Sequence, residues 1–130
     1  MTTYTREQIM QMDAEQLRMA IAEAKGWYRF RHYKNGMLSG LRNDPEYGVL
    51  INAVPDWPTS IVDADPLIDE IVSAGYHINL LDYMSLGELW HFGIYADDGW
   101  LLILAQGKSR AEAISRAYLM WLNEAQHESN

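Results

Sequence analysis

The middle half of this chain carries no positively charged side chain. Residues 43–106 contain no Lys or Arg and eleven Asp or Glu, whereas residues 1–42 carry seven bases and four acids, and the rest carries three of each. The net charge of −8 therefore divides into +3, −11 and 0 along the chain. A stretch of 64 residues without a cation cannot neutralise its own acids. Either the basic N-terminal third folds against it or an acidic surface remains.

Size and composition predict one domain over residues 1–130. A chain of this length buries enough surface to build a core without disulfides, and the absence of Cys excludes disulfide frameworks, zinc knuckles and thiol chemistry. The negative charge argues against direct binding to nucleic-acid phosphate. The longest apolar run is Trp100–Ala105, and the polar N-terminus has no signal-peptide core, so we expect neither a membrane span nor export.

Three segments carry helix signals. Asp13 with Gln16 forms an N-terminal capping pair, which predicts a helix over 14–25 that ends at Gly26. Asp65-Pro66 reads as an N-cap followed by proline in the first helical position, which predicts a short helix ending near Gly75. The capping box Ser109–Glu112 predicts the longest helix, over about 110–126.

Strand signals fill the intervals between these helices. Residues 27–41 read as a β-hairpin with a type I′ turn at Asn35-Gly36, in which strict alternation places Tyr28 and Phe30 on one face and Trp27 on the other. Asp97-Asp98-Gly99 predicts a second tight turn. Further strands are expected at 49–54 (short and buried), 76–81, 89–95 and 100–105 (central and covered on both faces).

The resulting order is α-β-β-β-α-β-β-β-α. It predicts an α+β fold with a mainly antiparallel sheet, three helices on one or both faces, and frayed ends at 1–10 and 126–130.

No residue set in the sequence supports catalysis. There is no G-x-S-x-G elbow, and the four His residues lack the spacing of metal ligands. Gly107-Lys108-Ser109 resembles the end of a phosphate-binding loop, but position 102 is Leu where that loop needs Gly. We therefore expect no catalytic residues, no metal and no cofactor.

The acidic residues of segment 43–106 have two possible interpretations. They can complement helix N-termini and turns, or they can form an acidic face that meets a basic partner. The candidate partner-binding residues are Asp56, Asp63, Asp65, Asp69, Glu70, Asp82, Glu88, Asp97 and Asp98.

The aromatic residues also have two readings. Five Trp and eight Tyr can serve as bulky core residues with a wet edge, or as a recognition surface together with Arg. Aromatic rings beside Arg are suited to stacking on a nucleotide and neutralising it. The candidate ligand-binding residues are Trp27, Arg29, Arg31, Tyr33 and Trp57.

Several short motifs together resemble a phage family. An N-terminal helix ends in Ala22-Glu23-Ala24-Lys25-Gly26-Trp27, Pro58-Thr59-Ser60-Ile61 runs into an amphipathic helix ending at Ala74-Gly75-Tyr76, a strand carries Trp90, and Gly107–Ala117 closes the series. This order is similar to the small phage proteins of the NinX type and the related phage α-β-α sandwich domain. The resemblance implies phage or prophage origin and action in the bacterial cytoplasm, and it implies no catalytic residues.

The sequence thus favours a non-enzymatic phage accessory protein that inhibits a host protein complex, such as a defence complex, through an acidic surface rimmed by aromatic residues. One alternative is an oligomeric sponge for a nucleotide-like signal. A second alternative is a structural or accessory phage protein without an inhibitory role. A homo-oligomer is expected under either leading reading, because apolar surface is often left over on a small aromatic-rich sheet.

Overall fold

The computed structural model describes residues 3–83 and 89–128, with side chains for 3–79 and 89–125. Within these residues the helices and strands follow one another as α1 (Arg6–Gln11), α2 (Ala14–Ala24), β1 (Tyr28–His32), β2 (Leu38–Asp44), β3 (Gly48–Ala53), α3 (Ile61–Ser73), β4 (His77–Tyr83), β5 (Leu89–Tyr95), β6 (Leu101–Gly107) and α4 (Arg110–Glu128).

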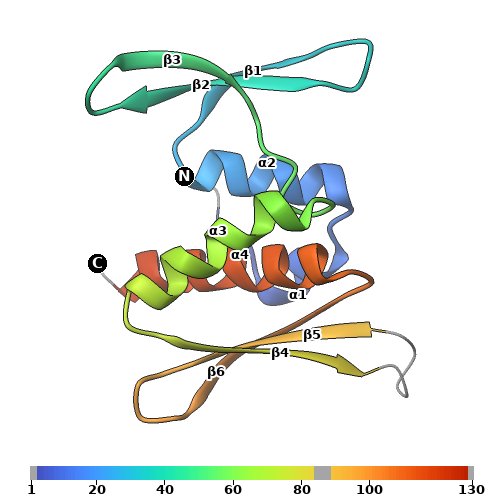
Figure 1. Ribbon diagram of the computed structural model, residues 1–130, viewed down its shortest axis with the longest axis vertical. Helices are drawn as coiled ribbons and strands as arrows, with labels where there is room; N and C mark the ends of the chain where they lie inside the picture. Colours follow the sequence, from blue (N-terminus) through green and yellow to red (C-terminus); the bar gives the residue numbers. More distant parts are fainter. Residues whose placement is uncertain (1–2, 84–88, 129–130) are drawn as a thin grey trace.

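The helices form a layer between two separate sheets (Figure 1). Sheet 1 has the order β1-β2-β3 and sheet 2 the order β4-β5-β6, and every pairing is antiparallel. The predicted α+β class is therefore confirmed. The helices lie between the two sheets instead of covering the faces of one sheet.

Helix α4 is the centre of this arrangement. Ile114, Ala117, Tyr118 and Leu119 point in different directions around the helix, yet each is at most 1% exposed. A helix that is buried all round must be packed on every side. Helix α4 contacts β5 and β6 of sheet 2 on one side and α1, α2 and α3 on the others. It therefore joins both halves of the chain into one core.

The approach of α4 to sheet 2 depends on a glycine. A Cβ atom at Gly107, the last residue of β6, would lie 2.5 Å from the backbone nitrogen of Ala113. No real Cβ contact is so short, so only glycine allows the first turn of α4 to cross the end of β6 at this distance.

Strand β6 is an edge strand, so the prediction of a central, doubly covered strand at 100–105 is wrong. Ile103 and Ala105 point inward and are buried, but Leu104 is 48% exposed and Trp100, just before the strand, is 73% exposed. The central strand of sheet 2 is β5. A continuous apolar run identifies a strand but does not determine its place in the sheet.

Two arginines cover the free edge of β6. Arg6 Nη2 donates to the carbonyl of Leu102 at 2.7 Å, and Arg116 Nη1 donates to the carbonyl of Gln106 at 2.9 Å. Residues four apart on a strand direct their carbonyls to the same edge. These side chains occupy positions that an added strand would use.

Sheet 1 departs from its predicted strand patterns. A bulge in β1, with Arg29 at φ 52°, breaks the alternation, so that Trp27 and Phe30 both pack over Gly40 of β2. Strand β3 is an exposed edge and not the predicted buried strand, because no described residue covers its outer face and Ile51 is 73% exposed. The hairpin is confirmed, but only Gly36 of its turn has a positive φ, so the turn is not type I′.

Helix boundaries differ from the prediction at three places. Residues 6–11, expected to be frayed, form α1, in which Ile9 is fully buried. Helix α3 begins at Ile61, where the Ser60 side chain accepts a hydrogen bond from the backbone of Asp63, so Asp65 is not its N-cap. At the other end of the chain, α4 continues to Glu128.

Replacing Gly107 with Ala should lower the free energy of unfolding by about 3 kcal/mol, because the new methyl group must push α4 away from β6. Urea unfolding followed by circular dichroism measures the loss. Gly99→Ala is the matched control, since Gly99 has φ 92° but open space around it, and it should cost only about 1 kcal/mol. A smaller loss for Gly107→Ala than for Gly99→Ala would disprove the close contact.

Candidate functional site

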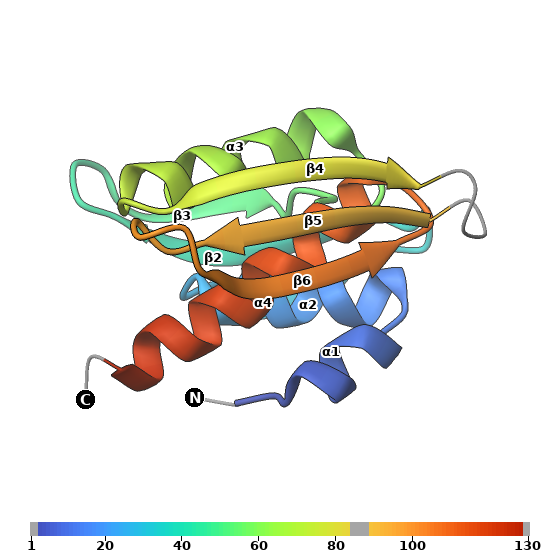
Figure 2. The same cartoon turned by 90° about the horizontal axis from the view of Figure 1, so that it is seen from below.

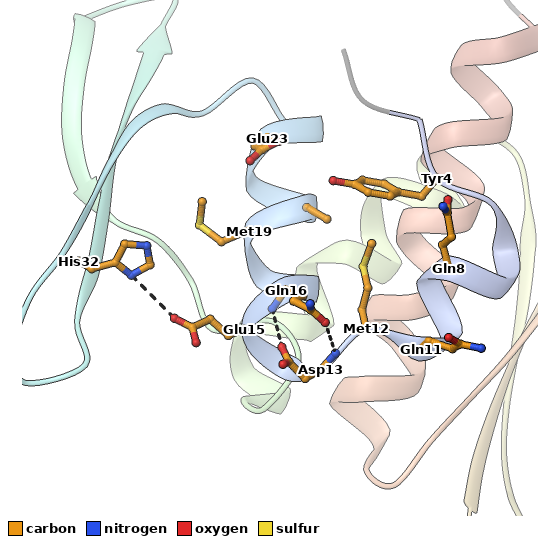
Figure 3. Close-up of a pocket in the computed structure, with 11 residues that line it drawn as sticks. Tyr4, Gln8, Gln11, Met12, Asp13, Glu15, Gln16, Met19, Glu23 and His32 are labelled. Carbon is orange, nitrogen blue, oxygen red and sulfur yellow. Dashed lines mark hydrogen bonds and ion pairs between the residues drawn. The ribbon is translucent and has the colours of Figure 1, made fainter.

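A groove of about 710 Å³ crosses the exposed face of α2. On one side it is bounded by α1 and the segment before it, and on the other side by His32 of β1 (Figure 3). We call it the α2 groove and define it by its lining residues, which are Tyr4, Gln8, Gln11, Met12, Asp13, Glu15, Gln16, Met19, Ala20, Glu23 and His32.

Two consecutive capping boxes build the groove. The Thr5 and Gln8 side chains each bond the other residue's backbone N–H, and Asp13 and Gln16 repeat the arrangement eight residues later. Only Met12 and Asp13 lie between the two helices, and Met12 is extended, with φ −68° and ψ 137°. Such caps fix where each helix starts, so the chain turns sharply and α1 is set beside α2.

Helix α1 lies beside α4 (Figure 2), and hydrogen bonds from α4 hold it in place. Arg6 forms two hydrogen bonds to the carboxylate of Glu124, at 3.0 and 2.6 Å. Asn123 Nδ2 donates to the carbonyl of Tyr4 at 3.3 Å, and Arg116 Nη2 donates to the carbonyl of Met12 at 3.1 Å. A six-residue helix is unstable alone, so these bonds from α4, together with burial of Ile9, maintain this side of the groove.

The apolar part of the groove consists of Met12, Met19, Tyr4 and Ala20. The first three are partly buried against the core, and Ala20 belongs to it. Methionine side chains are unbranched and polarisable, and they adapt to different apolar partners. This part of the groove can therefore accept aliphatic or aromatic groups of varied shape.

The polar part of the groove is acidic. Asp13, Glu15 and Glu23 contribute three carboxylates, whereas no Lys or Arg is among the described residues that line it. Glu15 is held 3.8 Å from the ring of His32, and its side chain is 75% exposed. The amides of Gln8, Gln11 and Gln16 add neutral hydrogen-bonding groups. The lining suits a ligand that presents both a cation and apolar surface.

Three cations of the N-terminal third, Arg6, Arg18 and Lys25, are engaged away from the groove. Arg6 pairs with Glu124, and Lys25 Nζ lies 2.8 Å from Glu70 of α3. Arg18 donates to the carbonyls of Val54 and Pro55 on the far side of α2. The N-terminal third is basic in total, but these contacts leave an acidic groove on its surface. Sequence reasoning missed this site because it summed the charges of the segment.

The predicted partner-binding acids have separate structural surroundings. Asp63 accepts a hydrogen bond from the backbone of Asp56, and Glu70 pairs with Lys25. In the β5–β6 turn, Asp97 lies 3.2 Å from His77 and Asp98 accepts a bond from the backbone of Trp100.

Asp65 and Asp69 are exposed on α3, beyond its first turn, so helix capping does not explain them. Glu88 and the side chain of Asp82 lie outside the described residues.

The predicted ligand-binding residues fall into two groups. Trp27 and Trp57 line a second cavity, of about 610 Å³, between sheet 1 and α3. Arg31 lies over the ring of Tyr33 at 5.2 Å in the hairpin, and Arg29 is exposed in the bulge. The structure therefore brings the two tryptophans together at one cavity, which none of the other three residues lines.

Near this second cavity, Tyr118 joins the ion pair of Lys25 and Glu70. The Tyr118 hydroxyl donates to Glu70 at 3.1 Å, and Lys25 Nζ lies 5.4 Å from the centre of the tyrosine ring. Burial raises the pKa of Tyr118 well above its ordinary value, and the charge of Glu70 raises it further. The phenol thus stays protonated and positions Glu70.

The described residues contain no candidate metal site and no candidate membrane span. Among them no cluster of three His, Asp or Glu side chains could hold a metal ion. Likewise, no helix in residues 3–83 and 89–128 is both long and apolar enough to cross a membrane. Comparison of the chain with protein-family models, curated proteins and solved structures gives no significant match.

The groove acids should differ in their contribution to stability. Asp13→Ala removes an N-cap and should lower the free energy of unfolding by about 1 kcal/mol. The double replacement Glu15→Gln with Glu23→Gln should change it by less than about 0.5 kcal/mol, because both side chains are on the surface. Urea unfolding of the two variants gives the comparison. An equal loss in both would mean that Glu15 and Glu23 serve the fold.

Proposed function

We propose that this chain is a non-enzymatic binding protein whose α2 groove holds a basic, partly apolar segment of a partner protein. The observation that carries the proposal is the lining of the groove, where three carboxylates stand beside two methionines and a tyrosine without any Lys or Arg. Carboxylates accept strong charge-assisted hydrogen bonds from Lys and Arg, and methionines provide adaptable apolar contact.

The energetics favour a partner whose cations reach the rim while its apolar side chains meet Met12, Met19 and Tyr4. Exposed charge pairs contribute little to affinity by themselves, so the apolar contact supplies stability and the carboxylates supply orientation and speed of encounter. A free metal ion or a small cation would use only one of these two features.

The resemblance to NinX-type phage proteins supports a biological setting for this activity. In that setting the chain is a phage or prophage accessory protein in the cytoplasm of the host bacterium, and it inhibits a host protein complex, such as a defence complex, by occupying a basic surface of it. Homo-oligomerisation also stays a prediction, with the exposed edge strand β3 as one available surface.

Affinity capture from bacterial lysate tests the proposal with two charge-reversed variants. Glu15→Lys with Glu23→Lys reverses the groove, and Asp65→Lys with Asp69→Lys makes the same change in charge on the exposed face of α3. The wild type and the α3 variant should capture the same protein at low salt. The groove variant should lose it, and so should the wild type at about 1 M salt, where electrostatic attraction is screened beyond about 3 Å.

The opposite pattern, with capture lost from the α3 variant and kept by the groove variant, would transfer the function to the acids of α3. Capture of no protein by the wild type at low salt would reject a protein-binding function. Circular dichroism of both variants confirms beforehand that neither reversal unfolds the chain.

A further inference from the structure

The second cavity shares no lining residue with the α2 groove and has a different chemistry. It is an open cavity lined by β2 and β3 of sheet 1, by the connector after β3, by α3 and by the residues that follow α2. We call it the sheet-1 cavity. The residues that carry its chemistry are Lys25, Trp27, Arg42, Asn52, Trp57 and Glu70.

Indole rings supply the apolar part of the sheet-1 cavity. Trp57 is 3% exposed and belongs to the core, so its position is fixed by packing. Trp27 is partly buried and packs on Gly40, where a Cβ would approach its Cε3 atom to 3.1 Å. The guanidinium carbon of Arg42 lies 5.9 Å from the centre of the Trp27 ring. Flat groups of this kind favour a flat ligand.

The charges of the cavity are balanced within the protein. Lys25 and Arg42 are its cations, and Asp63 and Glu70 are its acids. Lys25 Nζ lies 2.8 Å from Glu70, and Arg42 lies 3.7 Å from Asp44. Because each cation already has an acidic partner, a neutral ligand matches this lining better than an anion does.

Hydrogen-bonding groups of both kinds surround the cavity. Arg42 Nε donates to Asn52 Oδ1 at 2.8 Å, which orients the amide and leaves its NH₂ group for another acceptor. The cavity thus offers an amide donor from Asn52 of β3 and carboxylate acceptors from Asp63 and Glu70 of α3.

We propose that the sheet-1 cavity binds the base of a nucleoside. A nucleobase is flat, neutral and carries both donors and acceptors on its edges, and bases stack on aromatic side chains whatever their sequence. The volume of about 610 Å³ falls within the usual range for small-molecule sites. The balanced charges imply that a phosphate on the ligand adds little to its affinity.

Isothermal titration calorimetry with adenosine, guanosine, cytidine, uridine and their 5′-monophosphates tests this proposal. At least one nucleoside should bind, and its dissociation constant should lie within about threefold of that of its monophosphate, a difference below about 1 kcal/mol. Binding of no nucleoside overturns the proposal. A monophosphate that binds more than about tenfold tighter than its nucleoside overturns the choice of a neutral ligand.

Variants locate the site. Trp27→Leu should weaken binding about tenfold, as expected for the loss of one stacking ring, and Trp100→Leu, an exposed tryptophan outside the cavity, should leave it unchanged. If Trp27→Leu does not fold, Asn52→Ala on the exposed strand β3 replaces it as the test variant. It should lower the nucleoside affinity about threefold. If every folded variant at positions 27 and 52 binds the nucleoside with the affinity of the wild type, the ligand lies elsewhere and the proposal is overturned.

Discussion

The burial of α4 on all sides is the constraint on which the rest of the structure depends. Each sheet has three strands and must bury one face, and α4 provides apolar surface both to sheet 2 and to the other helices. Its alanines keep the packed layers close, and Gly107 lets it begin directly at the end of β6. The α2 groove depends on the same helix, because Arg116, Asn123 and Glu124 of α4 bind the segment around α1.

The charges of the chain become informative only after their contacts are known. Arg6, Arg18 and Lys25 lie in the basic third of the sequence, but each is committed to a carboxylate or to backbone carbonyls of a distant segment. These contacts connect the N-terminal third to the acidic middle and to α4. They also leave Glu15 and Glu23 on an open surface without a Lys or Arg in the groove. A stretch that sums to a positive charge can therefore carry an acidic site.

Local signals in the sequence correctly predicted the elements that local interactions control. The Asp13–Gln16 and Ser109–Glu112 pairs located the starts of α2 and α4, and the turn signals located the hairpins β1–β2 and β5–β6. The start of α3 was wrong because Asp65-Pro66 carries a strong local signal, while the actual cap at Ser60 lies five residues earlier. Helix α1 was missed although Thr5–Gln8 is a capping box like Asp13–Gln16, and this six-residue helix also depends on hydrogen bonds from residues more than a hundred positions away.

Features that depend on tertiary contacts could not be read from the chain. An apolar run at 100–105 gives no information on whether its outward leucines are covered, and in the structure they are exposed. The α2 groove combines residues 4–23 with His32 of another element, and its walls exist only because α4 holds α1. The α2 groove and the sheet-1 cavity also differ in chemistry. Carboxylates and methionines line the α2 groove, whereas tryptophans and a balanced set of acids and bases line the sheet-1 cavity.

The central claim is that the α2 groove, and not the acidic face of α3, is the main surface for basic partners. The most direct measurement is a nuclear magnetic resonance titration of the isotope-labelled protein with a short synthetic peptide of alternating Lys and Leu. The account predicts that the backbone amides of residues 8–23 shift most and that added salt reverses the shifts. Larger shifts over residues 61–73, or no shifts in either segment, would contradict it.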